Sequence, residues 1–103
     1  MQEALNALRK RLFTELRDID ELILYGSVAR GESDGESDID LLVITRRDFS
    51  RVERHRITDL VFDINLLYGT NFSTLVVDRR SWETGLFTVL PLHDEIIRDG
   101  IRL

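Results

Sequence analysis

The sequence contains no cysteine, a single proline and a single lysine, and it lacks any long apolar run. Without cysteine, the chain forms neither a disulfide nor a thiolate metal site. Its longest apolar runs, Leu22–Tyr25 and Leu41–Ile44, fall far short of the roughly 20 residues that a membrane-spanning helix needs. Because Met1 is followed by polar residues instead of an apolar leader segment, we expect a cytoplasmic protein with no membrane association.

The charge balance is acidic, and the composition is that of a folded domain. The 103 residues carry 14 basic and 19 acidic side chains, which gives a formal net charge of −5. Hydrophobic residues make up 43%, too many for an intrinsically disordered chain. No repeat or linker divides the sequence, so we expect one domain over residues 1–103. The acidic balance argues against nucleic acid as a direct ligand.

Apolar periodicity predicts both helices and strands. Leucines recur at helical spacing near the N-terminus, and short aliphatic runs that stop at glycine or polar turns predict strands. The expected helices cover 2–17, 49–58 and 91–98, and the expected strands cover 21–25, 38–44, 60–68 and 74–78, with a polar loop over 31–37. This order predicts an α/β or α+β fold, with one small mixed sheet flanked by helices.

The segment with the strongest chemical signal joins the first two expected strands. Gly26 and Ser27 follow the first strand, where glycine permits close approach of a ligand and the next amides open a helical turn. Arg30 follows three residues after Ser27 and is expected near the same anion. Asp38 and Asp40 begin the second strand, and because side chains alternate along a strand, both carboxylates face the same side.

The Gly-Ser turn and the Asp-x-Asp pair together are a more specific signal of function than either motif alone. A glycine and a serine also fit an ordinary strand end with a helix cap, and an Asp-x-Asp pair also fits an acidic loop. Two neighbouring carboxylates, however, repel each other unless a cation lies between them, and oxygen ligands suit Mg²⁺ or Mn²⁺. A phosphate-binding turn beside a metal pair is what nucleotide transfer from a metal-bound triphosphate requires.

Gly26-Ser27, a spacer of ten residues and Asp38-x-Asp40 resemble the signature of the nucleotidyltransferase superfamily related to DNA polymerase β. The longer string, Gly-Ser-x-Ala-Arg-Gly, a polar loop and Ser-Asp-x-Asp-Leu, is similar to the minimal stand-alone nucleotidyltransferases of prokaryotes. Members of that family are commonly encoded beside a small helical HEPN protein, as the antitoxin of a toxin–antitoxin pair. The resemblance implies the polymerase-β-like nucleotidyltransferase fold.

The resemblance also implies a role for each motif residue. The Gly-Ser turn would hold the triphosphate of ATP, and the two aspartates would bind two Mg²⁺ ions. A third carboxylate on a later strand would complete the metal site and help to activate the attacking hydroxyl. We assign that third carboxylate to Asp63, inside the expected strand over 60–68, with Asp59 just before the strand as the alternative.

An activity and a partner follow from the same resemblance. Larger relatives use a second domain to grip the base or the acceptor, and 103 residues leave no room for one. We therefore expect another protein, or a second copy in a homo-oligomer, to complete the cleft. The implied reaction is Mg²⁺-dependent transfer of AMP from ATP to a hydroxyl, expected to be a tyrosine, of a HEPN toxin. Two alternatives stay open: neutralisation of the partner by contact alone, and transfer to a small molecule such as an aminoglycoside.

A basic run lies between the second and third expected strands. Its members are Arg46, Arg47, Arg51, Arg54 and Arg56. A run of this kind is typical of a solvated helix face, and it also fits a contact surface for an acidic partner or for RNA.

Overall fold

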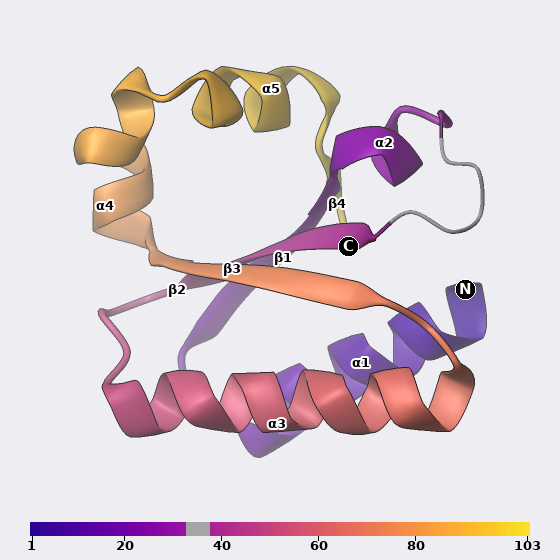
Figure 1. The fold of residues 1–103 in the computed structure, drawn as a ribbon. Coiled ribbons are helices and arrows are strands. Elements are labelled where there is room, and N and C mark those ends of the chain that lie inside the picture. The colour runs from indigo at the N-terminus through magenta and orange to yellow at the C-terminus, as the bar shows by residue number, and fades with distance from the viewer. Residues whose placement is uncertain (33–37) are drawn as a thin grey trace.

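The structure is a computed structural model that describes residues 1–32 and 38–103, so most of the loop predicted over 31–37 lies outside the described residues. A four-stranded sheet in the order β3-β2-β1-β4 forms the centre, with helices on both faces (Figure 1). The helices are α1 (Gln2–Glu15), α2 (Gly26–Ala29), α3 (Arg51–Tyr68), α4 (Arg79–Thr84) and α5 (Pro91–Asp99), with a 3-10 turn, η1 (Leu86–Val89). The strands are β1 (Ile19–Tyr25), β2 (Ile39–Thr45), β3 (Phe72–Asp78) and β4 (Ile101–Arg102). The predicted mixed sheet flanked by helices is confirmed.

The strand register aligns residues from three distant parts of the chain side by side across the sheet. β1 pairs antiparallel with both β2 and β4, whereas β3 runs parallel to β2 after the chain crosses over through α3. Tyr25 of β1 is paired with Asp40 of β2, and Asp40 is paired with Ser73 of β3. Because directly paired residues of neighbouring strands point to the same face, these three side chains share one face of the sheet.

β2 is the centre of the core because both of its faces are buried. Leu41 and Val43 pack into a cluster under α1 and α3, while Leu42 and Ile44 pack into a second cluster with Trp82 of α4. In Figure 1, α1 and α3 lie on one side of the sheet, and α2, α4 and α5 lie on the other. A strand covered on both faces is an almost continuous apolar run, which agrees with the strand predicted over 38–44.

The strand predicted over 60–68 is wrong, because these residues form the second half of α3. The helix predicted over 49–58 is confirmed as its first half, with Ser50 as the N-cap. The buried residues Ile57, Leu60, Val61 and Ile64 recur at helical spacing. Exposed Phe62, between Val61 and Ile64, and exposed Leu66 and Leu67, after Ile64, make the segment resemble a buried strand.

The other predicted elements agree with the structure, and three short elements were missed. The expected helices over 2–17 and 91–98 match α1 and α5, and the strands over 21–25 and 74–78 lie within β1 and β3. The missed elements are α4, η1 and β4, which have at most six residues each. Elements this short contain too few turns or alternations to produce a periodic apolar pattern.

Two side chains of α3 occupy the outer edge of β3. The Asn65 amide donates to the Phe72 carbonyl at 3.1 Å, and its oxygen accepts from the Phe72 N–H at 2.8 Å. Arg54 donates to the Val76 carbonyl at 2.9 Å. An open strand edge is a template for unwanted pairing, so these contacts protect part of the edge and hold the start of β3 in position.

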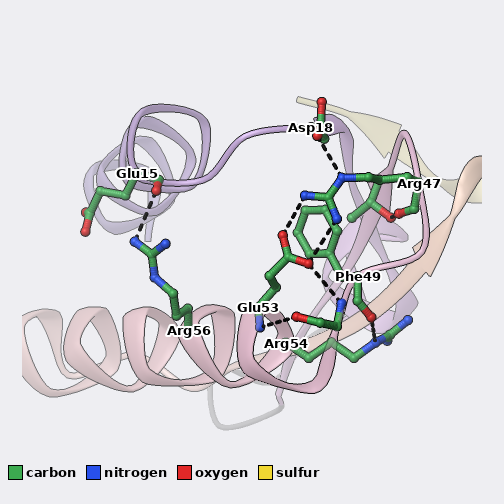
Figure 2. A network of polar contacts seen from close by, with 9 residues as sticks. Glu15, Asp18, Arg47, Phe49, Glu53, Arg54 and Arg56 are labelled. Atoms are coloured by element: carbon green, nitrogen blue, oxygen red, sulfur yellow. Dashed lines mark hydrogen bonds and ion pairs between the residues drawn. The ribbon is translucent and has the colours of Figure 1, made fainter.

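Ion pairs anchor the N-terminus of α3 (Figure 2). Arg47 donates to Asp18 at 2.9 Å and to both carboxylate oxygens of Glu53 at 3.0 and 2.6 Å. Glu53 also accepts from the Ser50 N–H at 2.9 Å, while the Ser50 hydroxyl accepts from the Glu53 N–H at 3.2 Å. This reciprocal capping box satisfies two amides at the helix start.

The basic run is therefore largely engaged within the chain. Besides Arg47, Arg54 donates to the Phe49 carbonyl and Arg56 donates to the Glu15 carbonyl, each at 3.2 Å. These contacts tie α3 to the preceding loop and to α1 (Figure 2). They favour a structural role for these arginines over the contact surface that the sequence left open.

Within residues 1–32 and 38–103, no helix combines the length and the apolar character that crossing a membrane requires.

The capping network predicts a pH-dependent contribution of Glu53 to stability. The Arg47 guanidinium and the Ser50 amide lower the pKa of Glu53 to about 2, below its ordinary value of 4.5. The ionised carboxylate therefore stabilises the fold above about pH 4.5, and this contribution disappears as the pH falls towards 2. We expect Glu53→Gln to lower the Tm by several degrees near neutral pH and to approach the wild-type Tm in acid. Thermal unfolding across the pH range measures both effects.

The exposed Glu83 of α4, which lies 3.6 Å from Arg79, provides the matched control. Glu83→Gln should change the Tm little, because an ion pair with an exposed carboxylate contributes little stability and Arg79 keeps its pairs with Asp20 and Glu21. A Tm difference between wild type and Glu53→Gln that stays constant down to pH 2 would contradict the assignment.

Candidate active site

The Asp40 carboxylate packs directly against the backbone of Gly26. The antiparallel pairing of Tyr25 with Asp40 places the end of β1, where α2 begins, beside the second residue of β2. Gly26 has a φ of +78°, and a Cβ atom built on it would lie 2.5 Å from Asp40 Oδ2. The positive φ favours glycine here, and a side chain at this position would displace the Asp40 carboxylate. Ser27 is the next residue, so the predicted Gly-Ser turn lies directly beside Asp40.

Asp38, just before β2, is held by Asn71, a residue that the sequence analysis missed. Asn71 lies just before β3, and its side-chain amide donates to Asp38 Oδ1. The Asn71 carbonyl also accepts from the Ile39 N–H at 2.9 Å. Parallel strands begin at the same edge of a sheet, so the residue before β3 meets the residue before β2. No sequence pattern marks Asn71, because only this pairing brings it to Asp38.

The two aspartates carry like charges, and Asp40 is partly buried whereas Asp38 is exposed. Burial raises the pKa of Asp40, and the charges of Asp38 and Glu95 raise it further. Like charges in a partly desolvated place favour binding of a cation between them. In the part of the chain that is described, no three histidine, aspartate or glutamate side chains are gathered as a ready-made metal group. The oxygen-only donors of Asp38 and Asp40 nevertheless suit Mg²⁺, which completes its shell with substrate phosphates and water.

Arg30 follows α2 and is bound by two carboxylates. Its guanidinium donates to Glu32 at 3.0 Å and to Glu95 of α5. These bonds raise the pKa of Arg30 above its already high ordinary value, so the side chain is a permanent cation. Its role in nucleotide binding stays a prediction, and Glu95 is a second neighbour of the site that the sequence analysis missed.

Asp63 does not lie where the sequence analysis expected it. It belongs to α3, on the opposite side of the sheet from α2 (Figure 1). Its side chain is 61% exposed and lies 3.7 Å from Arg11 of α1. The alternative, Asp59, is an exposed residue of the same helix. Assignment of the third carboxylate to Asp63 depended on the wrong strand over 60–68 and is therefore corrected.

β3 is the later strand that lies beside Asp40, and its residue paired with Asp40 is a serine. Ser73 of β3 is paired with Asp40 and is exposed. The acidic residue of β3, Asp78, lies at the other end of the strand, opposite Thr45. There it accepts from the Ser81 N–H at 3.0 Å and caps α4. β3 thus supplies no carboxylate beside the pair Asp38 and Asp40.

Comparison with known proteins identifies curated relatives from Methanocaldococcus jannaschii that are named putative protein adenylyltransferases. MJ1305 is 38% identical over 77 residues, which cover 73% of this chain and 51% of the relative. MJ0141 is 32% identical over 75 residues, which cover 72% of this chain and 76% of the relative. The matched part of this chain thus spans about half the length of MJ1305.

Solved structures with a similar fold include toxin–antitoxin complexes. One, a toxin–antitoxin with AMP-PNP, has a TM-score of 0.66 at 18% identity, covering 94% of this chain and 69% of that chain. A complex of tri-AMPylated HEPN toxin and MNT antitoxin from Shewanella oneidensis has a TM-score of 0.59 at 20% identity, covering 98% of this chain and 69% of that chain. Identities this low support the fold alone. The profile described as "Nucleotidyltransferase domain" matches residues 5–98, and the chain therefore belongs to this family, with minimal nucleotidyltransferases among its structural neighbours.

Proposed function

We propose that this protein transfers AMP from ATP, with Mg²⁺, to a tyrosine hydroxyl of a HEPN toxin and thereby acts as its antitoxin. The observation that carries the proposal is the contact of the Asp40 carboxylate with Gly26, which joins the acidic pair to the Gly-Ser turn. The names of the M. jannaschii relatives support adenylyl transfer to protein. The similar complexes with AMP-PNP and with an AMPylated toxin support the nucleotide and the partner.

In this proposal, each residue acts by binding or orientation. Gly26 leaves its backbone open to the triphosphate, and Ser27 adds a hydroxyl donor beside it. Asp38 and Asp40 would hold Mg²⁺, which when bound neutralises phosphate charge and lowers the pKa of the acceptor hydroxyl. The acceptor oxygen bonds to the α-phosphorus, the bond to pyrophosphate breaks, and the hydroxyl proton passes to solvent water. Positioning and charge neutralisation account for most of the rate in this class of reaction.

A second candidate function is neutralisation of the partner by contact alone. The observation that favours it is Ser73, which occupies the position beside Asp40 on the adjacent strand where the family resemblance implies a carboxylate. A site with two of three acids would bind nucleotide and metal more weakly and react more slowly.

Intact-mass spectrometry of a co-expressed HEPN partner separates the two functions. After incubation with ATP and Mg²⁺, we expect the partner to gain one or more AMP units. The gain should be absent with the Asp38→Asn/Asp40→Asn variant, which we expect to fold and to bind the partner. A partner that binds tightly without any gain in mass would contradict the proposed transfer and favour neutralisation by contact.

Replacing Gly26 tests its contact with Asp40. Gly26→Ala places a methyl group into the Asp40 carboxylate and strains a backbone with φ +78°, so we expect a more than tenfold loss of nucleotide affinity. Gly69→Ala is the matched control, because Gly69 has φ +65° and nothing within 4 Å of its added Cβ. Both variants incur a left-handed strain of about 1–2 kcal/mol, measured by thermal unfolding. Equal nucleotide affinities of the two variants would contradict a site at Gly26.

Replacing Asn71 tests whether it orients Asp38. Asn71→Leu keeps a similar side-chain size but removes the donor to Asp38, and we expect Mn²⁺ affinity to fall by about 10- to 100-fold, as for other residues that orient metal ligands. Mn²⁺ titration provides the measurement. Asn6→Ala, on the exposed surface of α1, is the control. An unchanged Mn²⁺ affinity in folded Asn71→Leu would show that Asp38 is oriented by other contacts.

A further inference from the structure

The C-terminal half of α3 carries a second apolar stripe, on the face that points away from the sheet. The inner face of this helix is buried in the core. On the outer face, Phe62, Leu66 and Leu67 are 60%, 69% and 75% exposed, and we call these three side chains the outer stripe. A helix that is apolar on opposite faces is normally buried on both, so the outer stripe has the character of a surface that another molecule covers.

The outer stripe adjoins a pocket that leads to the candidate site. Phe62 lines an open pocket of about 290 Å³ between α3 and β3, together with Asn65, Ser73 and Thr74. Ser73 is the residue of β3 that is paired with Asp40. α3 runs alongside β3 in Figure 1. A protein that covers the outer stripe and fills this pocket would therefore lie next to the acidic pair.

Two acidic side chains lie within the outer stripe. Asp59 precedes Phe62 by three residues and Asp63 precedes Leu66 by three, which places them on the same face of the helix. Both are exposed, and Asp63 stays 61% exposed although Arg11 lies 3.7 Å away. In a twofold dimer built on this face, the same carboxylates of two copies would meet and repel each other. The charge therefore favours a different protein, one with lysine or arginine around its apolar contact.

We propose that the outer stripe and the pocket at Ser73 form the docking surface for the acceptor protein. The acceptor places an apolar side chain against Phe62 and basic side chains against Asp59 and Asp63. This inference deepens the proposed function and rests on it, because adenylyl transfer to a protein needs the acceptor held beside the acidic pair. The surface selects the protein that is modified and leaves nucleotide binding to the candidate site.

Truncation of Phe62 tests the apolar contact. We expect Phe62→Ala to weaken binding of the co-expressed HEPN partner by about tenfold, mainly through faster dissociation, because an aromatic anchor is lost. Its affinity for ATP should stay at the wild-type value. Val52→Ala is the matched control, because Val52 is 71% exposed on the same helix but lies in its first turn. Biolayer interferometry with the immobilised partner measures both rate constants.

Removal of the two negative charges tests the charged contact. Asp59→Asn/Asp63→Asn should associate with the partner several-fold more slowly at low ionic strength, and high salt should abolish the difference, because salt screens the attraction between exposed charges. Glu83→Gln, an exposed substitution on α4, controls for the loss of negative charge. An unchanged association rate at low ionic strength would overturn the assignment of a basic partner surface.

Two other results would overturn the docking surface itself. One is wild-type partner binding in Phe62→Ala, with Leu66→Ala deciding instead if that variant does not fold. The other is a free wild-type dimer that Phe62→Ala converts to a monomer in light scattering, because the stripe would then join two copies of this chain. Loss of partner binding in Leu86→Ala alone, on the exposed surface of η1, would place the acceptor elsewhere.

Intact-mass spectrometry separates failure of this inference from failure of the proposed function. Wild-type binding and AMP transfer in Phe62→Ala would overturn the docking surface alone. Partner binding that depends on Phe62, without any AMP gain by the wild-type protein, would overturn the transfer and support the docking surface. A wild-type protein that does not bind the partner would overturn the proposed function and this inference with it.

Discussion

The close contact between the Asp40 carboxylate and the Gly26 backbone is the constraint on which the site depends. A Cβ at Gly26 would lie 2.5 Å from Asp40 Oδ2, so any other residue would push the acid or the turn away. The contact also shields Asp40 from water, which together with Asp38 and Glu95 raises its pKa. The same packing thus positions the acid and partly desolvates it, and a neighbouring positive charge would stabilise its ionised form.

The sheet topology explains why residues so distant in sequence meet at this contact. β1 runs antiparallel to β2, so the end of β1 adjoins the start of β2. β3 runs parallel to β2, so both strands start at the same edge, where Asn71 reaches Asp38. This parallel arrangement requires the crossover through α3, whose Asn65 holds the first residue of β3 through both backbone groups. The helix on one side of the sheet therefore sets the position of a residue at the site.

The arginine-rich composition has an internal explanation in this fold. Arg47 joins Asp18 to Glu53, and Arg79 joins Asp20 to Glu21. The planar guanidinium presents several donors at once, which suits bridging of two groups better than the single ammonium of lysine does. Arg30 likewise bridges Glu32 and Glu95 of α5. One residue type thus joins neighbouring elements in several regions of the fold.

The sequence by itself determined the class of fold, the motif Gly26-Ser27 with Asp38-x-Asp40, and most of the helices and strands. Those features are local, because each depends on apolar periodicity or on residues a few positions apart. Only the tertiary structure decided that 60–68 is helical, since burial of Ile57, Leu60, Val61 and Ile64 under the sheet outweighs the appearance of an apolar strand. It also moved Asp63 away from the site and brought Asn71 and Glu95 to it. Strand pairing and helix packing decide such placements, because they join residues whose separation along the chain carries no signal of contact.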